Sequence, residues 1–285
     1  MIDFLQLVIY GIVLGCILSL GAVGVSLTFG ILRFANFAHG DLMTVGAYLG
    51  FVLTRQVGTP FWVSLVLASL LTAGVAIVVD SLVFRHLRRR PPVILLISSF
   101  GIALILRSLI QIIWGSDQLV YRQGIQQPWQ IGGLNLKPDQ LTVVVGTILL
   151  VIGLSLFLQR TKTGKAMRAM ADNADLAKIS GINTERVVLW TWVLGSITAC
   201  AAGIFLGLDT QVSPVMGWRI LLPIFAATIL GGIGSPYGAI AGGLVIGLAS
   251  ELSTLIVSPA YKSAVAFAIL IVMLIVKPTG LVGGR

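Results

Sequence analysis

Apolar residues run along this chain in long segments that short charged or glycine-rich stretches interrupt. A helix needs roughly 20 residues to cross the roughly 30 Å hydrocarbon core of a membrane. Most of the segments reach that length and two are shorter. The segments with at most one charged residue are 4–32, 42–54, 56–79, 91–114, 140–159, 187–208, 220–250 and 263–276.

The segment 220–250 is too long for one simple crossing, and Gly231, Gly232, Gly234 and Pro236 interrupt it in the middle. It therefore predicts two helical pieces. The pattern as a whole predicts an all-α fold, a polytopic transmembrane helical bundle with about nine membrane segments, of which one or two are broken or re-entrant. We expect a single membrane domain over residues 1–285.

Composition supports a membrane location. Hydrophobic residues make up 57% of the chain and charged residues 10%, against about 45–50% and about 25% in soluble domains. These values exclude a soluble enzyme, a disordered chain and a nucleic-acid-binding domain. The net charge of +9 does not indicate nucleic acid, because the basic residues are few and lie between apolar runs. Cys16 and Cys200 lie in such runs without metal-ligand spacing, so we expect no metal site.

The basic residues predict which ends of the segments face the cytoplasm. Ten of the nineteen Lys and Arg residues lie in two loops, and cytoplasmic loops are typically enriched in these residues. Residues 115–139, in which Asp117 and Asp139 balance Arg122 and Lys137, should lie outside, as should residues 209–219. Three later crossings would bring Lys277 and Arg285 inside, whereas a re-entrant 220–234 piece would leave them outside. The basic residues of the two loops are Arg85, Arg88, Arg89, Arg90, Arg160, Lys162, Lys165, Arg168, Lys178 and Arg186.

The cytoplasmic loop 160–186 is too long for a simple connector. Its apolar spacing predicts one helix and then a second short one that starts at Asp175 and ends before Gly181. Small residues such as Ala177 allow close approach by another backbone. The loop is therefore either a docking unit for a cytoplasmic partner or a solvated basic loop that only fixes topology.

Polar groups also occur at or near membrane depth. Asn36, His39 and Asp41 separate two apolar segments, where they either line a translocation path or fix a break between helices. In the other interpretation, His39 and Asp41 lie at an aqueous boundary and only cap the next helix. Arg107 and Glu251 lie within apolar segments, and we expect them to form a structural ion pair. His39 and Asp41 have no assignable nucleophile beside them, so a membrane enzyme is disfavoured.

The glycine block Gly231-Gly232-Ile233-Gly234-Ser235 has no following Lys-Ser/Thr and is not a phosphate-binding loop. Within a membrane it either exposes backbone groups towards a cavity or forms a tight turn between helices. Glycines at spacings near four follow it and predict a close helix contact, within the chain or with a partner. These glycines are Gly238, Gly242, Gly243 and Gly247.

Four ordered blocks resemble the permeases of high-affinity branched-chain amino-acid ABC importers. They are Asn36-Phe37-Ala38-His39-Gly40-Asp41, Thr163-Gly164-Lys165-Ala166 through Gly181-Ile182-Asn183, Leu230-Gly231-Gly232-Ile233-Gly234-Ser235 with Gly238-Ala239, and Lys277-Pro278-Thr279-Gly280-Leu281. Together they cover most of the chain. Loop 160–186 also resembles the coupling loop of ABC importer permeases, with Asp175 in place of the usual Glu and Leu176 in place of the first Ala.

The resemblance implies a transport subunit that is not itself an enzyme, in the bacterial plasma (inner) membrane. It implies a second homologous permease subunit, two cytoplasmic ATPase subunits that bind ATP and Mg, an external substrate-binding protein, and no cofactor in this chain. The implied ATPase-coupling residues are Thr163, Gly164, Lys165, Ala166, Arg168, Asp175, Ala177 and Gly181, and the implied translocation-path residues are Asn36, His39, Asp41, Gly231, Gly232, Gly234 and Ser235. A urea or short-amide importer remains an alternative, and an ion-coupled secondary transporter that uses Glu251, Arg107 and His39 is a further one.

Overall fold

The computed structural model describes the whole chain except residues 1, 89, 122–126, 132, 278 and 283–285. Four residues used above, Arg89, Arg122, Pro278 and Arg285, lie outside the described residues. Nearly all of the regular structure is helical. The exception in the described part is a short antiparallel hairpin of β1 (Trp129–Ile131) and β2 (Leu134–Leu136), which lies between two long helices.

Within the described residues, seven helices are long and apolar enough to cross a membrane. Two shorter helices complete nine segments: α2 (Ala38–Phe51), which a π-helical stretch over Val52–Gln56 extends, and α10 (Met216–Gly231). The prediction of an all-α bundle with about nine segments is confirmed. The seven long ones are α1 (Ile2–Leu32), α3 (Phe61–Val79) continued through Asp80–Phe84 into α4 (Arg85–Leu87), α5 (Pro92–Trp114), α6 (Pro138–Arg160), α9 (Thr184–Asp209), α11 (Pro236–Leu252, with a 3-10 turn over Ser253–Leu255), and α12 (Lys262–Val276, preceded by a 3-10 turn over Pro259–Tyr261).

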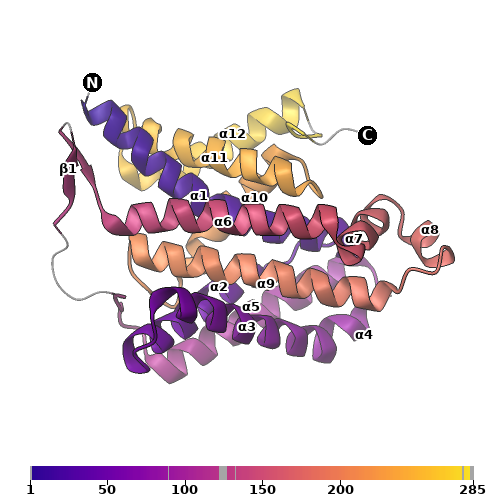
Figure 1. The fold of residues 1–285 in the computed structure, drawn as a ribbon. Coiled ribbons are helices and arrows are strands. Elements are labelled where there is room, and N and C mark those ends of the chain that lie inside the picture. Colours follow the sequence, from indigo (N-terminus) through magenta and orange to yellow (C-terminus); the bar gives the residue numbers. More distant parts are fainter. Residues whose placement is uncertain (1, 89, 122–126, 132, 278, 283–285) are drawn as a thin grey trace.

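The two basic loops lie at the same end of the bundle, as their charge predicted. Figure 1 shows α4 at the end from which α7 (Lys162–Asp172) and α8 (Ala174–Ile179) project, with the β1–β2 hairpin at the opposite end. Arg88 at the end of α4 forms an ion pair of 3.0 Å with Glu185 at the start of α9, which joins the two loops. We call this end the basic end.

The last three helices bring the C-terminal part of the chain to the basic end. Figure 1 shows α12 running towards the side from which α7 projects. The backbone N–H of Leu281 donates to the carbonyl of Leu230 at the end of α10, at 2.8 Å. This arrangement agrees with the option of three crossings after residue 219.

Helices α1 and α9 form the centre of the bundle. In their most apolar stretches 72% and 78% of the residues are buried, against 6% in α12. Helix α11 packs closely against α1, where a Cβ added at Gly247 would lie 2.3 Å from the Gly15 nitrogen and one at Gly243 would lie 2.4 Å from the Ser19 hydroxyl. The predicted close contact of the glycine stripe is therefore an internal one.

Helices α2 and α10 both begin inside the bundle, and their first turns touch. A Cβ at Gly217 would lie only 1.8 Å from the carbonyl oxygen of Gly40, and the Gly217 N–H donates to the Thr44 hydroxyl at 3.1 Å. His39 at the start of α2 lies against Gly24, eight residues before the end of α1, which is about 12 Å into the bundle. The prediction that residues 209–219 form an external loop is therefore wrong for Arg219, which lies in the first turns of α10.

Candidate functional site

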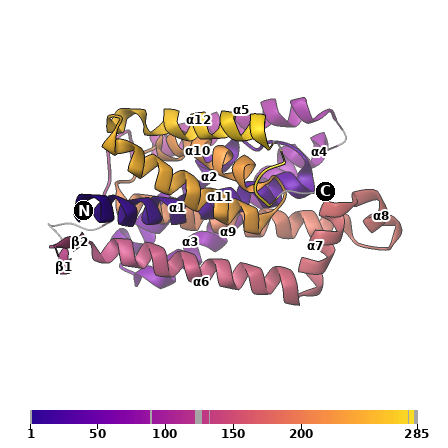
Figure 2. The ribbon, with the colours of Figure 1, turned by 90° about the horizontal axis from the view of Figure 1, so that it is seen from above.

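Helices α7 and α8 form a unit that projects beyond the basic end of the bundle (Figures 1 and 2). The Thr161 hydroxyl accepts from the Gly164 N–H at 2.9 Å, and the Asn173 side chain accepts from the Leu176 N–H at 3.0 Å, so a side-chain cap starts each helix. Gly164 permits the sharp turn out of α6, because a Cβ there would lie 2.5 Å from the Leu158 carbonyl oxygen.

The residues predicted to couple to an ATPase divide into a buried and an exposed set. Gly164 and Ala177 are buried against this chain itself, and Thr163 and Ala166 are half-buried. Lys165, Arg168, Asp175 and Gly181 are exposed. The buried members hold the unit together, and only the exposed members are placed to meet another protein.

Sequence reasoning missed the two most conspicuous exposed side chains of the unit. Leu176 is 61% exposed and Ile179 is 85% exposed, both on α8. They lie three residues apart, so they share one face of the helix. Two apolar residues at this spacing in an otherwise polar loop are the sequence signal that could have identified them. At the tip of a projecting unit, such a pair is typical of a protein contact.

Gly181 ends α8 in a left-handed conformation with φ of +83°, and no atom lies within 4 Å of an added Cβ. Replacing Gly181 with Ala should therefore strain the backbone without a clash, at a cost of about 1–2 kcal/mol. If loop 160–186 couples to an ATPase, as the sequence resemblance implies, we expect Gly181→Ala to lower, but not abolish, substrate-stimulated ATPase activity. Ser180→Ala, at φ of −74°, is the matched control. Equal activities in the two variants would show that this turn does not matter for coupling.

Met167 and Met170 anchor α7 in the bundle, since both are buried. Helix α7 contacts α1, α6 and α9. A small cavity of about 60 Å³ lies between α7, the end of α1 and the start of α11, and Met167, Gly30 and Gly234 are among its lining residues. A displacement of α7 would therefore act directly on α1, α6 and α9, which it contacts.

The polar residues at the start of α2 are buried in the protein. Asn36, His39 and Asp41 are each at most 1% exposed. The Asn36 side chain accepts from the Ala38 N–H at 3.1 Å just before α2 begins. The alternative that His39 and Asp41 lie at an aqueous boundary is wrong, because both are buried. A role in the translocation path stays a prediction for all three.

Asp41 forms a two-bond ion pair with Arg107 of α5. The Arg107 Nε donates to Asp41 Oδ1 at 3.0 Å and the second guanidinium nitrogen donates to Oδ2 at 2.9 Å. The guanidinium also lies 4.8 Å from the ring centroid of Trp218 in α10. Arg107 thus connects α2, α5 and the first turn of α10 deep in the bundle.

The predicted pair of Arg107 with Glu251 is wrong. Glu251 lies near the end of α11 and receives two hydrogen bonds from the Lys262 ammonium, at 2.6 and 2.7 Å. Lys262 follows eleven residues later at the start of α12, after a short connection, so it is the nearer cation. The sequence shows that Arg107 and Glu251 carry opposite charges within or near apolar segments. It does not show which helices meet, so it could not identify the partner of each.

The glycine block forms a tight turn at the basic end. Gly232 and Gly234 have φ of +105° and +84°, and a Cβ at Gly231 would lie 2.1 Å from the Gly238 carbonyl oxygen. The Ser235 hydroxyl accepts from the Gly238 N–H at 3.2 Å and caps α11. The block therefore forms the tight turn between helices that was one of its two predicted roles. A role in the translocation path stays a prediction.

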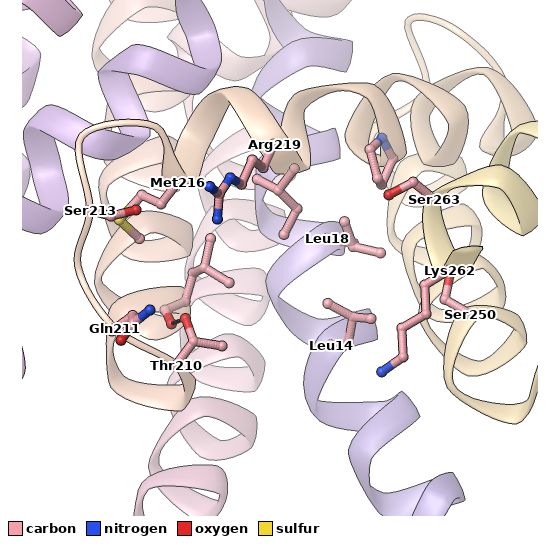
Figure 3. A pocket seen from close by; sticks show the side chains of 13 residues that line it. Leu14, Leu18, Thr210, Gln211, Ser213, Met216, Arg219, Ser250, Lys262 and Ser263 are labelled. Atoms are coloured by element: carbon pink, nitrogen blue, oxygen red, sulfur yellow. Dashed lines mark hydrogen bonds between the residues drawn. The ribbon is translucent and has the colours of Figure 1, made fainter. Parts of the chain in front are cut away.

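A larger cavity, which we call the outer cavity, opens in the half of the bundle away from the basic end (Figure 3). Its volume is about 400 Å³, and its wall includes Leu14 and Leu18 of α1, Thr210, and Arg219 of α10. None of the residues predicted to line a path contributes to it. Sequence reasoning missed Arg219 because the chain gives no sign that α10 begins inside the bundle.

Known proteins are similar in sequence to this chain over nearly its full length. Residues 7–274 match the family model described as "Branched-chain amino acid transport system / permease component". The permease protein LivH of the high-affinity branched-chain amino acid transport system of Escherichia coli K12 is 32% identical over 98% of this chain and 96% of its own. The corresponding permease BraD of Pseudomonas aeruginosa is 30% identical over the same shares.

One solved structure shares the fold. PsaBC from Streptococcus pneumoniae in complex with Fab aligns over 97% of this chain and 92% of its own, with a TM-score of 0.55 and 15% identity. That similarity concerns the fold alone, whereas the family match covers nearly all membrane segments of the chain. The chain belongs to the family of permease components of branched-chain amino acid transport systems.

Proposed function

We propose that this multi-pass membrane permease translocates branched-chain or other neutral apolar amino acids in an ATP-driven importer of the bacterial plasma membrane. Its proposed partners are a second homologous permease, two cytoplasmic ATPase subunits and an external substrate-binding protein. ATP and Mg would bind to the ATPase subunits, and this chain would hold no cofactor. The cargo is proposed from the relatives, which are named as permeases of branched-chain amino acid systems.

The projecting α7–α8 unit is the observation that carries this proposal. Its exposed pair, Leu176 and Ile179, offers an apolar contact for an ATPase subunit. Its anchor, Met167 and Met170, is buried among the ends of membrane helices. Movement of the docked subunit would therefore shift α7 and, through it, α1 and the α10–α11 turn.

Alternating access follows from the same contacts. Helices α2 and α10 meet at Gly40 and Gly217 inside the bundle, so each spans only part of it. Short helices that end within a bundle are typical of transporters whose path opens alternately to each side. We propose that shifting α10 at its basic end changes the opening of the outer cavity at its other end.

Affinity purification of the full chain from native membranes tests the assembly. The expected result is recovery of a second permease and two ATPase copies for each tagged chain. Recovery of the chain without any ATPase, under detergent conditions that keep the two permeases together, would contradict the proposed function.

A further inference from the structure

The outer cavity combines an apolar wall with one free positive charge. Leu14, Leu18, Leu206 and Ile220 supply aliphatic surface on α1, α9 and α10. A volume of about 400 Å³ falls within the roughly 300–1,000 Å³ of ordinary small-molecule sites. The cavity can therefore take a ligand that is apolar over most of its surface.

Arg219 is the free charge of the outer cavity. Its side chain has no hydrogen bond or ion pair with any of the described residues, and Figure 3 shows its guanidinium pointing into the cavity. The other cation of the wall, Lys262, is already bound to Glu251. The neighbouring Arg107 is bound to Asp41. Among the cavity-lining residues that the structure describes, Arg219 alone is left to attract an anion.

The Arg219 side chain is exposed, and its place along the bundle is at membrane depth. The cavity that it faces is lined by Leu18, which lies at the middle of the 31-residue α1. An arginine at membrane depth generally faces water or a specific partner, because its burial in hydrocarbon costs several kcal/mol. The guanidinium also lies near the positive N-terminal end of α10, which adds to the local attraction for an anion.

Hydroxyl groups lie on the same wall. The Thr210 hydroxyl donates to the Leu206 carbonyl at 2.8 Å, so its oxygen is still able to accept a hydrogen bond. Ser213 also lines the cavity, near Arg219 in Figure 3. Acceptors of this kind suit an ammonium group. The wall thus has an arginine that suits a carboxylate, hydroxyl oxygens that suit an ammonium group, and apolar surface that suits an aliphatic side chain.

We propose that the outer cavity is a substrate subsite in which Arg219 binds the α-carboxylate of the transported amino acid. The aliphatic side chain lies against Leu14, Leu18 and Leu206, and the ammonium faces Thr210 and Ser213. With one free charge the site binds weakly enough to release its ligand again. This inference rests on the proposed function for the identity of the ligand.

A thiol-protection assay on the complete complex tests the subsite without ATP. Gln211→Cys places a reporter on the cavity wall, while the two native cysteines, Cys16 and Cys200, are buried. The probes are L-leucine, 4-methylpentanoate, which lacks the ammonium, and leucinol, which lacks the carboxylate. We expect leucine and 4-methylpentanoate to slow labelling by a membrane-impermeant thiol reagent, and leucinol to have no effect at equal concentration.

Substitutions at Arg219 sharpen the test. Because a hydrogen bond to a charged group is worth more than one between neutral groups, Arg219→Leu should raise the leucine concentration needed for protection at least about tenfold. Arg219→Lys should show a smaller increase. Arg55→Leu is the control, since Arg55 is an exposed arginine near the outer end of α2 and outside the cavity.

Equal protection in wild type and Arg219→Leu, equal protection by leucinol and leucine, or no protection by leucine would each overturn the subsite. ATP-dependent leucine uptake by the wild-type complex is measured in parallel. Uptake without Arg219-dependent protection rejects the subsite and leaves the proposed function intact. Arg219-dependent protection by the carboxylates without any ATP-dependent uptake supports the anion site and rejects the proposed function.

Discussion

Replacing Asp41 with Leu is expected to destabilise the protein by about 3–5 kcal/mol, because it leaves the Arg107 charge buried without its partner. The Asp41 side chain is fully buried and that of Arg107 is 15% exposed, so water cannot compensate for the lost carboxylate. The pair also connects α2 and α5 to Trp218 of α10. We therefore expect the loss to loosen the meeting point of the two short helices.

Thermal unfolding of the purified protein in detergent measures this effect. The double variant Asp41→Leu/Arg107→Met should recover much of the lost stability, because it removes both charges together. The control is Glu185→Gln, which breaks the pairs of a 60% exposed carboxylate at the basic end and should cost about 1 kcal/mol or less. An unfolding temperature of Asp41→Leu equal to that of Glu185→Gln would show that the buried pair is not a stabilising link.

Replacing Leu176 and Ile179 together with Ser is expected to abolish coupled transport while leaving the membrane bundle folded. Both side chains point away from the rest of the chain, so their loss removes little internal packing. Large apolar side chains at the centre of a protein contact often contribute 2 kcal/mol or more each. The double variant should lose substrate-stimulated ATPase activity and copurification of the ATPase subunits.

Two further variants separate docking from folding. Lys178→Ser alters an exposed neighbour on α8 and should retain most activity. Ala177→Leu forces bulk into a site that is only 4% exposed, so it should act by disturbing α8 itself. Normal copurification of the ATPases with Leu176→Ser/Ile179→Ser would refute the docking role of this pair.

The sequence pattern predicted the membrane architecture well, since apolar length and charge position are local properties. The nine segments, the two basic loops at one end and the two helices of loop 160–186 all follow from them. The same patterns predicted that Glu251 needs a partner, because a charge within an apolar segment is costly without one.

Contacts between segments could not be predicted from the sequence. Arg107 meets Asp41 of α2 because two short helices begin inside the bundle, and the sequence does not show that they begin there. Because α10 begins inside the bundle, Arg219 lines a cavity, whereas the sequence had suggested that it lies in an external loop. Ala177 is small, which suggested a docking surface, yet it packs against its own chain and leaves the surface to Leu176 and Ile179.

Uptake of radiolabelled leucine into proteoliposomes tests the proposed function most directly. The vesicles contain the purified complex and enclose ATP and Mg, with the substrate-binding protein outside. Coupled import predicts leucine accumulation that requires ATP and falls when excess unlabelled valine, but not urea, is added. Accumulation driven by an ion gradient without ATP, or competition by urea in place of valine, would contradict it.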